Sequence, residues 1–199
     1  MRNNQARFNV GYGPGNSAAQ KKEKVNLLVL IVVYLLTFLG LTLLIVSQST
    51  TSWTIVDNYK DFVYPDEYQG LWQICYDKQE YECNPRLGLS WLYVVRVFEL
   101  LAFLLFAIVI GIYIASHINK NVKPSLAAGF LLLAALLVLI AMIVYTAKAP
   151  LPRTVDRNRN PYVTREFKIR FGYSYLVGWA GLLLTFMAGI VALMLHRRV

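Results

Sequence analysis

The chain has 199 residues, of which 57% are hydrophobic, and it carries a formal net charge of +9. This composition is too apolar for an ordinary soluble domain and indicates a membrane protein with several spans. The positive charge does not indicate a nucleic-acid partner, because the basic residues gather in tails and loops next to apolar runs.

Four apolar runs reach the length of a membrane span, which is about 20 residues for a hydrocarbon core of about 30 Å. They are Val25–Val46, Trp91–Ala115, Ser125–Tyr145 and Ser174–Leu195. Backbone polar groups must be paired within lipid, so each run is expected to be a helix. The sequence therefore predicts an all-α membrane protein in which residues 25–195 form one four-helix transmembrane bundle, followed by a short tail at 196–199.

Residues 1–24 are polar and glycine-rich and show no apolar period, so we expect a disordered tail. The first apolar run is longer than the core of a signal peptide, and no clear small-residue cleavage site follows it, which favours an uncleaved span. Lys21, Lys22 and Lys24 adjoin this span, and its other side has no lysine or arginine until Lys60. The first span usually sets the orientation, so both termini are expected in the cytosol of a multi-pass plasma-membrane protein.

The first predicted outer loop, residues 47–90, holds the only two cysteines of the chain, Cys75 and Cys83. Seven residues separate them, which indicates a hairpin closed by a disulfide in an oxidising compartment. Such a bond would stabilise the loop by about 2–3 kcal/mol in the chain-entropy model. The alternatives are free thiols or half of a zinc site, but zinc needs about four ligands and the loop has no histidine.

Runs of strand-forming residues predict short antiparallel strands in this loop. The runs are Thr54–Val56, Asp61–Tyr64, Leu71–Tyr76 and Tyr81–Cys83. In the second outer loop, residues 146–173, Phe167, Ile169 and Phe171 alternate with charged residues, which is typical of an edge strand. Together the runs predict a small antiparallel extracellular β-sheet above the bundle.

An ordered signature runs from the first loop into the second span: Trp53, Gly70, Leu71, Trp72, Cys75, Cys83 and Arg96. In a four-span chain of this length, this order resembles the claudin superfamily. That group includes the claudins, the peripheral myelin and epithelial membrane proteins, and the gamma subunits of calcium channels. The start of the fourth span, residues 171–181, is similar to the same group in its aromatic residues, a serine and Gly178-Trp179. The resemblance implies the extracellular sheet and an arginine that holds the loop.

Arg96 and Glu99 lie three residues apart near the outer end of the second span, so they share one helical face. Pairing lowers the cost of two charges in a membrane, and we predict an ion pair in which Arg96 also hydrogen-bonds the loop. A permeation or gating role is the alternative. Trp53 and Trp72 are expected at the membrane–water boundary, either as interfacial anchors or as residues that hold the loop against the bundle.

Small residues mark the expected contacts between helices, because they let two backbones approach closely. In the third span they are Ala127, Ala128, Gly129, Ala134 and Ala135. In the fourth span they are Gly178, Gly181, Thr185 and Gly189.

The two outer loops carry opposite charge. The first has seven acidic and three basic residues, and the second has seven basic and two acidic residues. The candidate charged surface consists of Asp61, Asp66, Glu67, Arg157, Arg159, Arg165, Lys168 and Arg170. Three interpretations stay open for the basic second loop: a solvated face without a partner, contact with the acidic first loop, and contact in trans with an acidic surface on a neighbouring cell or subunit.

The sequence shows no catalytic constellation. Both histidines lie near span ends on the predicted cytosolic side, and no glycine-rich phosphate loop occurs. We therefore expect a protein that is not an enzyme and that has no metal and no cofactor. Membrane lipid is an expected partner and nucleic acid is not.

The first hypothesis for function is a claudin-like structural protein of cell–cell junctions. It would form homo-oligomers in its own membrane and use both outer loops for adhesion and for a barrier or paracellular charge selectivity. The second is an auxiliary subunit that binds an ion channel or receptor in the same membrane, through the small-residue face of the fourth span and the sheet. A third is an epithelial or myelin-type membrane organiser.

Overall fold

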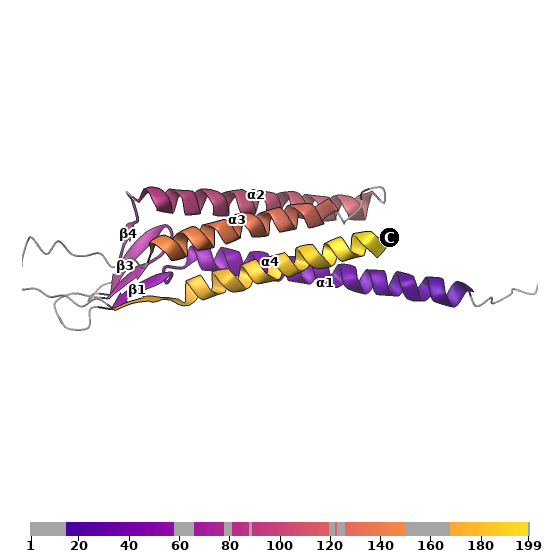
Figure 1. Cartoon of the computed structure of the whole chain (residues 1–199), viewed down its shortest axis with the longest axis horizontal. Coiled ribbons are helices and arrows are strands. Elements are labelled where there is room, and N and C mark those ends of the chain that lie inside the picture. Colours follow the sequence, from indigo (N-terminus) through magenta and orange to yellow (C-terminus); the bar gives the residue numbers. More distant parts are fainter. Residues whose placement is uncertain are drawn as a thin grey trace, which may run out of the picture.

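The computed structural model describes residues 15–57, 66–77, 81–87, 89–119, 122, 126–149 and 168–198. Within these ranges the chain forms four helices, each with a stretch long and apolar enough to cross a membrane. They are α1 (Gly15–Ser49), α2 (Ser90–Ile118), α3 (Ala127–Lys148) and α4 (Tyr173–Arg198). The helices lie side by side as one elongated bundle (Figure 1). The predicted four-span bundle is confirmed.

The first helix departs most from the predicted span. It begins at Gly15, so residues 15–24, which the sequence analysis assigns to a disordered tail, are helical. The run Ala18–Lys24 consists mostly of good helix formers, and lengthening an existing helix needs no new nucleation. Residues 1–14 of the predicted tail lie outside the described residues. At the other end of the chain, α4 continues to Arg198.

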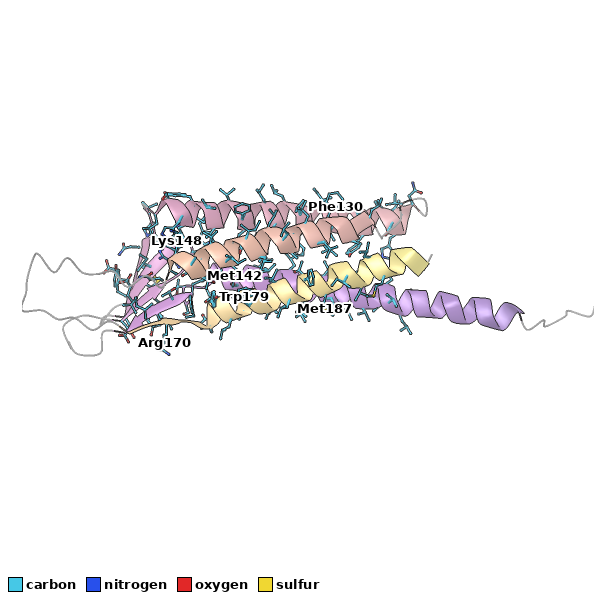
Figure 2. The ribbon with its side chains drawn as sticks, viewed as in Figure 1. Phe130, Met142, Lys148, Arg170, Trp179 and Met187 are labelled. Carbon is cyan, nitrogen blue, oxygen red and sulfur yellow. A yellow bond between two sulfur atoms is a disulfide. The ribbon has the colours of Figure 1, made fainter. Side chains whose placement is uncertain are left out.

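The centre of the bundle is α3, which packs between α2 and α4, while α1 packs against α4. Ala134 and Ala141 on α3 are fully buried, and their short side chains let the neighbouring helices approach. Phe106 of α2 and Met142 of α3 are among the largest buried side chains of this core. Figure 2 shows side chains filling the space between the ribbons, with Met142 on the inner part of α3.

Three glycines of α4 face other helices at close range. A Cβ on Gly181 would lie 2.9 Å from Leu44 Cγ on α1, and one on Gly178 would lie 2.9 Å from Ser47 Oγ on the same helix. A Cβ on Gly189 would instead meet a side chain of α3 at 2.8 Å. The predicted packing residues of the fourth span therefore make contacts inside the bundle, on two sides of α4.

Thr185 belongs to the same contact between α1 and α4. It is fully buried, and its hydroxyl donates a hydrogen bond to the Gly181 carbonyl at 2.8 Å, which pairs the hydroxyl within its own helix. A Cβ on Gly40 of α1 would lie 2.9 Å from this hydroxyl oxygen. The two helices thus meet at a point that has no room for a larger side chain.

Five strands in the described part of the chain form one sheet at one end of the bundle, which we call the sheet end (Figure 1). Between α1 and α2 lie β1 (Thr54–Asp57), β2 (Glu67–Gln69), β3 (Gln73–Asp77) and β4 (Tyr81–Pro85), and before α4 lies β5 (Lys168–Phe171). The strand order is β4-β3-β2-β1-β5, and all neighbours are antiparallel. The predicted small antiparallel sheet is confirmed, with β5 at one edge.

The strands differ from the prediction most clearly at β3 and β2. The strand expected from Leu71 begins at Gln73, because the Gly70 N–H donates to the Gln73 carbonyl at 2.9 Å and turns the preceding residues out of the sheet. Strand β2 was not predicted, since Tyr68 is its one strong strand former. The predicted run Asp61–Tyr64 lies outside the described residues.

Strand β5 joins the two loops into a single sheet. It pairs with β1, and the register places Lys168 opposite Asp57 and Arg170 opposite Ile55. Of the three interpretations of the loop charges, this register supports contact between the two loops.

Candidate functional site

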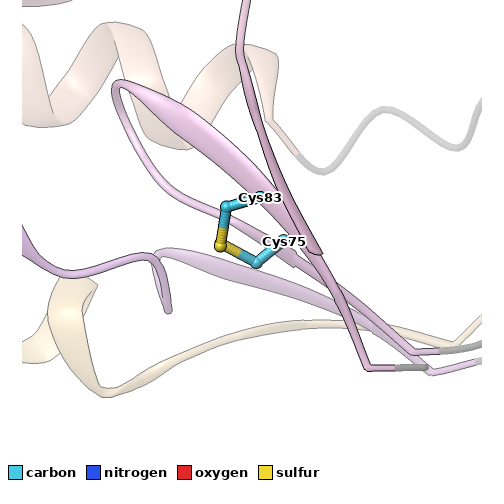
Figure 3. Close-up of a disulfide and its surroundings, with 2 residues drawn as sticks. All are labelled: Cys75 and Cys83. Carbon is cyan, nitrogen blue, oxygen red and sulfur yellow. A yellow bond between two sulfur atoms is a disulfide. The ribbon is translucent and has the colours of Figure 1, made fainter. Parts of the chain in front are cut away.

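Cys75 and Cys83 form a disulfide that joins β3 to β4 (Figure 3). The two residues are directly opposite in the strand register, so the bond crosses the middle of the hairpin. Cys75 is buried, whereas Cys83 is exposed on the edge strand. The predicted disulfide is confirmed, and because it uses both cysteines of the chain, neither free thiols nor thiolate zinc ligands remain.

Arg96 connects α2 to the first loop. Its Nε and Nη2 donate hydrogen bonds to the Leu71 carbonyl at 2.9 and 2.6 Å, and Nη2 also donates to the Arg86 carbonyl at 2.6 Å. The guanidinium carbon lies 5.0 Å from the ring centre of Trp72 and 5.2 Å from that of Tyr93, within the range of a cation–π contact. The expectation that Arg96 hydrogen-bonds the loop agrees with this geometry. The residue is 7% exposed, so these bonds are shielded from water.

The predicted ion pair between Arg96 and Glu99 is replaced by other partners. Glu99 lies one helical turn further into the bundle, where its Oε2 accepts a hydrogen bond from Gln48 Nε2 of α1 at 2.8 Å. The guanidinium of Arg96 instead reaches out of the helix toward the loop carbonyls. Glu99 is 1% exposed, so its carboxyl joins α2 to α1 inside the bundle.

Arg86 also belongs to this site, although in the sequence it is only one of the three basic residues of the first loop. It is 3% exposed, and its Nη1 donates to the Gly70 carbonyl at 2.8 Å. Its Nη2 donates to Gln69 Oε1 at 2.9 Å, and Gln69 Nε2 donates in turn to Glu67 at 2.7 Å. The guanidinium also lies 5.6 Å from the ring centre of Trp91. We call the side chains of Arg86 and Arg96, with the turn Gly70–Trp72 between them, the arginine latch.

Trp53 fixes the start of β1 to the bundle. Its indole Nε1 donates a hydrogen bond to the Ser47 carbonyl at 2.6 Å, and its ring packs edge-on against Tyr145 of α3 at 4.8 Å between centres. The side chain is 1% exposed, so it lies inside the protein rather than at a boundary with lipid and water. Trp72, by contrast, is 43% exposed beside Arg96. Of the two roles considered for Trp53, holding the loop against the bundle fits this geometry.

Hydroxyl groups near Trp53 form hydrogen bonds between the elements at the sheet end of the bundle. The Ser47 hydroxyl donates to the Ser174 carbonyl at 2.7 Å, which joins α1 to α4. Thr54 of β1 and Tyr145 of α3 share a hydrogen bond of 2.8 Å, which joins the sheet to the third helix. Each bond pairs a polar group that would otherwise be unsatisfied in an apolar setting.

Two glycines let the chain pass close to the start of β1. A Cβ on Gly70 would lie 2.9 Å from Thr51 Cα, and one on Gly172 would overlap the Ser52 carbonyl. The Gly172 N–H donates to the Trp53 carbonyl at 3.0 Å, so this close approach also carries a hydrogen bond. Glycine at the signature position 70 is therefore required by contact with backbone atoms.

The candidate charged surface is described only in part. Asp66 and Glu67 are half-buried at β2, and Arg170 is exposed on β5, beyond the sheet end of the helices in Figure 2. Lys168 is placed by its register opposite Asp57. The members outside the described residues are Asp61, Arg157, Arg159 and Arg165.

The sequence model of the PMP-22/EMP/MP20/Claudin family matches residues 26–192, a range that includes the sheet and reaches into all four spans. The chain belongs to this family. It is also similar to the human (Homo sapiens) lens fiber membrane intrinsic protein, with 27% identity over 166 residues that cover 80% of this chain and 87% of the relative. The resemblance to the claudin superfamily is thereby confirmed.

Membership of the PMP-22/EMP/MP20/Claudin family makes this chain a multi-pass membrane protein of a structural family. Its described residues contain no group of three or more His, Cys, Asp or Glu side chains that is placed to hold a metal ion. The arrangement of these residues is suited to a structural role. The arginine latch, the disulfide and Trp53 hold a sheet built from both loops in a fixed position on the bundle.

Proposed function

We propose that this family member is a structural protein of cell–cell junctions. In this proposal the chain lies in the plasma membrane with both termini in the cytosol, forms homo-oligomers side by side, and presents its sheet end to the adjacent cell. One observation carries the proposal: strands from both loops form one sheet, and buried hydrogen bonds fix that sheet to the bundle. A surface held in place before contact loses less conformational entropy on binding.

The charges on the sheet suggest how such a junction would treat ions. Four acidic residues lie on this part of the sheet: Asp66 just before β2, Glu67 in β2, Asp77 in β3 and Glu82 in β4. The exposed Arg170 lies at the opposite edge, on β5. A surface lined by one sign of charge raises the local concentration of the opposite ion. In the proposed function, the β2–β4 side attracts cations to a path between cells and the β5 edge opposes them.

The auxiliary-subunit alternative relied on two docking surfaces, the small residues of α4 and the sheet. Gly178 and Gly181 already contact α1, and Gly189 already contacts α3. The small-residue face of α4 is therefore occupied within the chain, which supports the junction proposal over an auxiliary subunit that docks through it. Neither an auxiliary subunit nor a membrane organiser of the epithelial or myelin type needs the same protein on the adjacent cell. Behaviour at cell contacts therefore separates both from the junction proposal.

A mixed-cell contact assay tests the proposal. Tagged full-length protein is expressed in cells that lack junctional strands, and its enrichment is measured at contacts between two expressing cells and at contacts where only one cell expresses it. The proposal expects enrichment at contacts between two expressing cells only. Uniform surface distribution at both kinds of contact would overturn it and direct the search to a partner in the same membrane.

A further inference from the structure

The first helix is longer than its membrane span. It has 35 residues, whereas its apolar run begins only at Val25. Residues 15–24 therefore add about 15 Å of helix ahead of the apolar run, at 1.5 Å per residue. Figure 1 shows α1 running past the ends of the other three helices at the end opposite the sheet. We call residues 15–24 the projecting segment.

The projecting segment is basic where it leaves the span. It contains Lys21, Lys22 and Lys24, with Glu23 as its one acidic residue. Along the helix axis, Lys24 lies about 1.5 Å and Lys21 about 6 Å ahead of Val25. The headgroup layer on each side of a bilayer is about 5–8 Å thick. A helix that continues in the direction of its span therefore places these lysines within the headgroup layer.

The rest of the sequence at this end is also basic. α4 ends at the same end of the bundle, with Arg197 and Arg198 as its last helical residues (Figure 1). The sequence that links α2 to α3 contains Lys120 and Lys123 and no acidic residue. The chain has 11 acidic residues, and Glu23 is the only one in the projecting segment, the end of α4 and the sequence that links α2 to α3. The charge at this end is thus almost entirely of one sign, and it lies next to four spans.

We propose that the end of the bundle opposite the sheet binds anionic phospholipid, with Lys21, Lys22 and Lys24 in the headgroup layer. The chemistry is that of lysine ammonium groups beside the phosphate and carboxylate groups of a phosphatidylserine-type leaflet. Each lysine close to such a surface contributes about fivefold to the association. The interaction is electrostatic, so it weakens as salt shortens the distance over which the charges act.

Spin-labelled lipids test this proposal on the full-length chain in mixed bilayers. Electron paramagnetic resonance gives the association of labelled phosphatidylserine with the protein relative to labelled phosphatidylcholine. The wild-type protein is expected to prefer phosphatidylserine by about fivefold at the sites that the lysines form. A triple substitution, Lys21→Gln, Lys22→Gln and Lys24→Gln, is expected to remove most of this preference, and replacing the same lysines with arginine is expected to keep it.

The matched control removes the same charge elsewhere, through Arg157→Gln, Arg159→Gln and Arg165→Gln in the sequence between α3 and β5. The proposal expects this control to keep the lipid preference. Circular dichroism checks that each variant retains its helix content. A wild-type protein that does not distinguish the two lipids would overturn the proposal and leave an acidic protein as the candidate partner. An equal loss in the control would also overturn it, because the effect would then follow net charge.

Discussion

The guanidinium of Arg96 donates a hydrogen bond of 2.6 Å to the main-chain carbonyl of Arg86, so the two buried arginines form one unit. Arg86 holds the Gly70 carbonyl, and Arg96 holds the adjacent Leu71 carbonyl. The turn that carries the Gly-Leu-Trp signature is therefore fixed from two sides. Hydrogen bonds from charged donors are stronger than neutral ones and hold the acceptor in a defined direction.

Replacing Arg86 with alanine tests the half of the latch that lies in the loop. The change removes hydrogen bonds to Gly70 and Gln69 and leaves the Gly70 carbonyl without this donor. We expect the free energy of unfolding to fall by about 2–3 kcal/mol. Thermal unfolding in detergent measures the loss. Lys148→Ala is the control for removal of one positive charge, since Lys148 is exposed, and its effect should be within about 0.5 kcal/mol. Equal effects of the two changes would contradict a buried structural role for Arg86.

The hydrogen bond between Gln48 and Glu99 predicts an asymmetry between two substitutions. Gln48→Leu removes the donor and leaves a buried carboxyl without it, so we expect a loss of about 1–3 kcal/mol. Glu99→Gln keeps an oxygen that accepts from Gln48, and its loss is expected to be smaller. Unfolding in detergent ranks the two variants. A larger loss for Glu99→Gln would show that the charge of Glu99, rather than its acceptor oxygen, stabilises the bundle.

Much of this site follows from local sequence, and the rest depends on contacts between distant segments. The disulfide was predictable because Cys75 and Cys83 are the only cysteines and lie in one loop. The role of Arg96 followed from its place in a known order of residues. The burial of Arg86 was not predictable, because a loop arginine close to acidic residues normally stays in water. One nearby residue in the sequence, Trp91 at the start of α2, could have indicated this burial, because the guanidinium of Arg86 lies over its ring.

The partner of Glu99 shows the same limit. A pair three residues apart on one helix is the simplest expectation for a buried charge, and Arg96 supplied it. The actual donor, Gln48, comes from α1, 51 residues earlier in the chain. The pattern of apolar residues within a helix does not indicate that α1 and α2 approach each other at the sheet end. The three-residue strand β2 escaped prediction for a related reason, because its pairing with β1 and β3 outweighs weak local propensity.

Two glycines on different helices give a matched test of helix packing. Gly181 faces Leu44 and Gly40 of α1, whereas a Cβ on Gly111 of α2 meets nothing within 4 Å. Gly181→Ala is expected to destabilise the protein by about 1–3 kcal/mol through overpacking. Gly111→Ala is expected to be neutral or to stabilise by up to about 1 kcal/mol, because alanine is the better helix former. Thermal unfolding compares them, and equal shifts of the same sign would contradict the packing assigned to α4.

Loss of the disulfide should act on the first loop. Cys75→Ser opens the β3–β4 hairpin, and we expect a loss of about 2–3 kcal/mol in the chain-entropy model, with retention of the protein in the secretory pathway. Surface labelling with an antibody against the folded loop measures the outcome. Normal surface display with an intact loop epitope would contradict a structural role for this bond. Cys83→Ser should behave in the same way, because it breaks the same bond.

In this structure α2 holds the sheet through Arg96, and hydrogen exchange on Arg96→Lys tests that role. Lysine keeps the charge but lacks the planar fork that reaches both the Leu71 and Arg86 carbonyls. We expect amide exchange in residues 69–77 and 81–86 to rise by about tenfold, which corresponds to about 1.4 kcal/mol of local opening energy, while the buried centre of α3 is unchanged. Unchanged exchange in the sheet, or an equal rise in α3, would contradict that role.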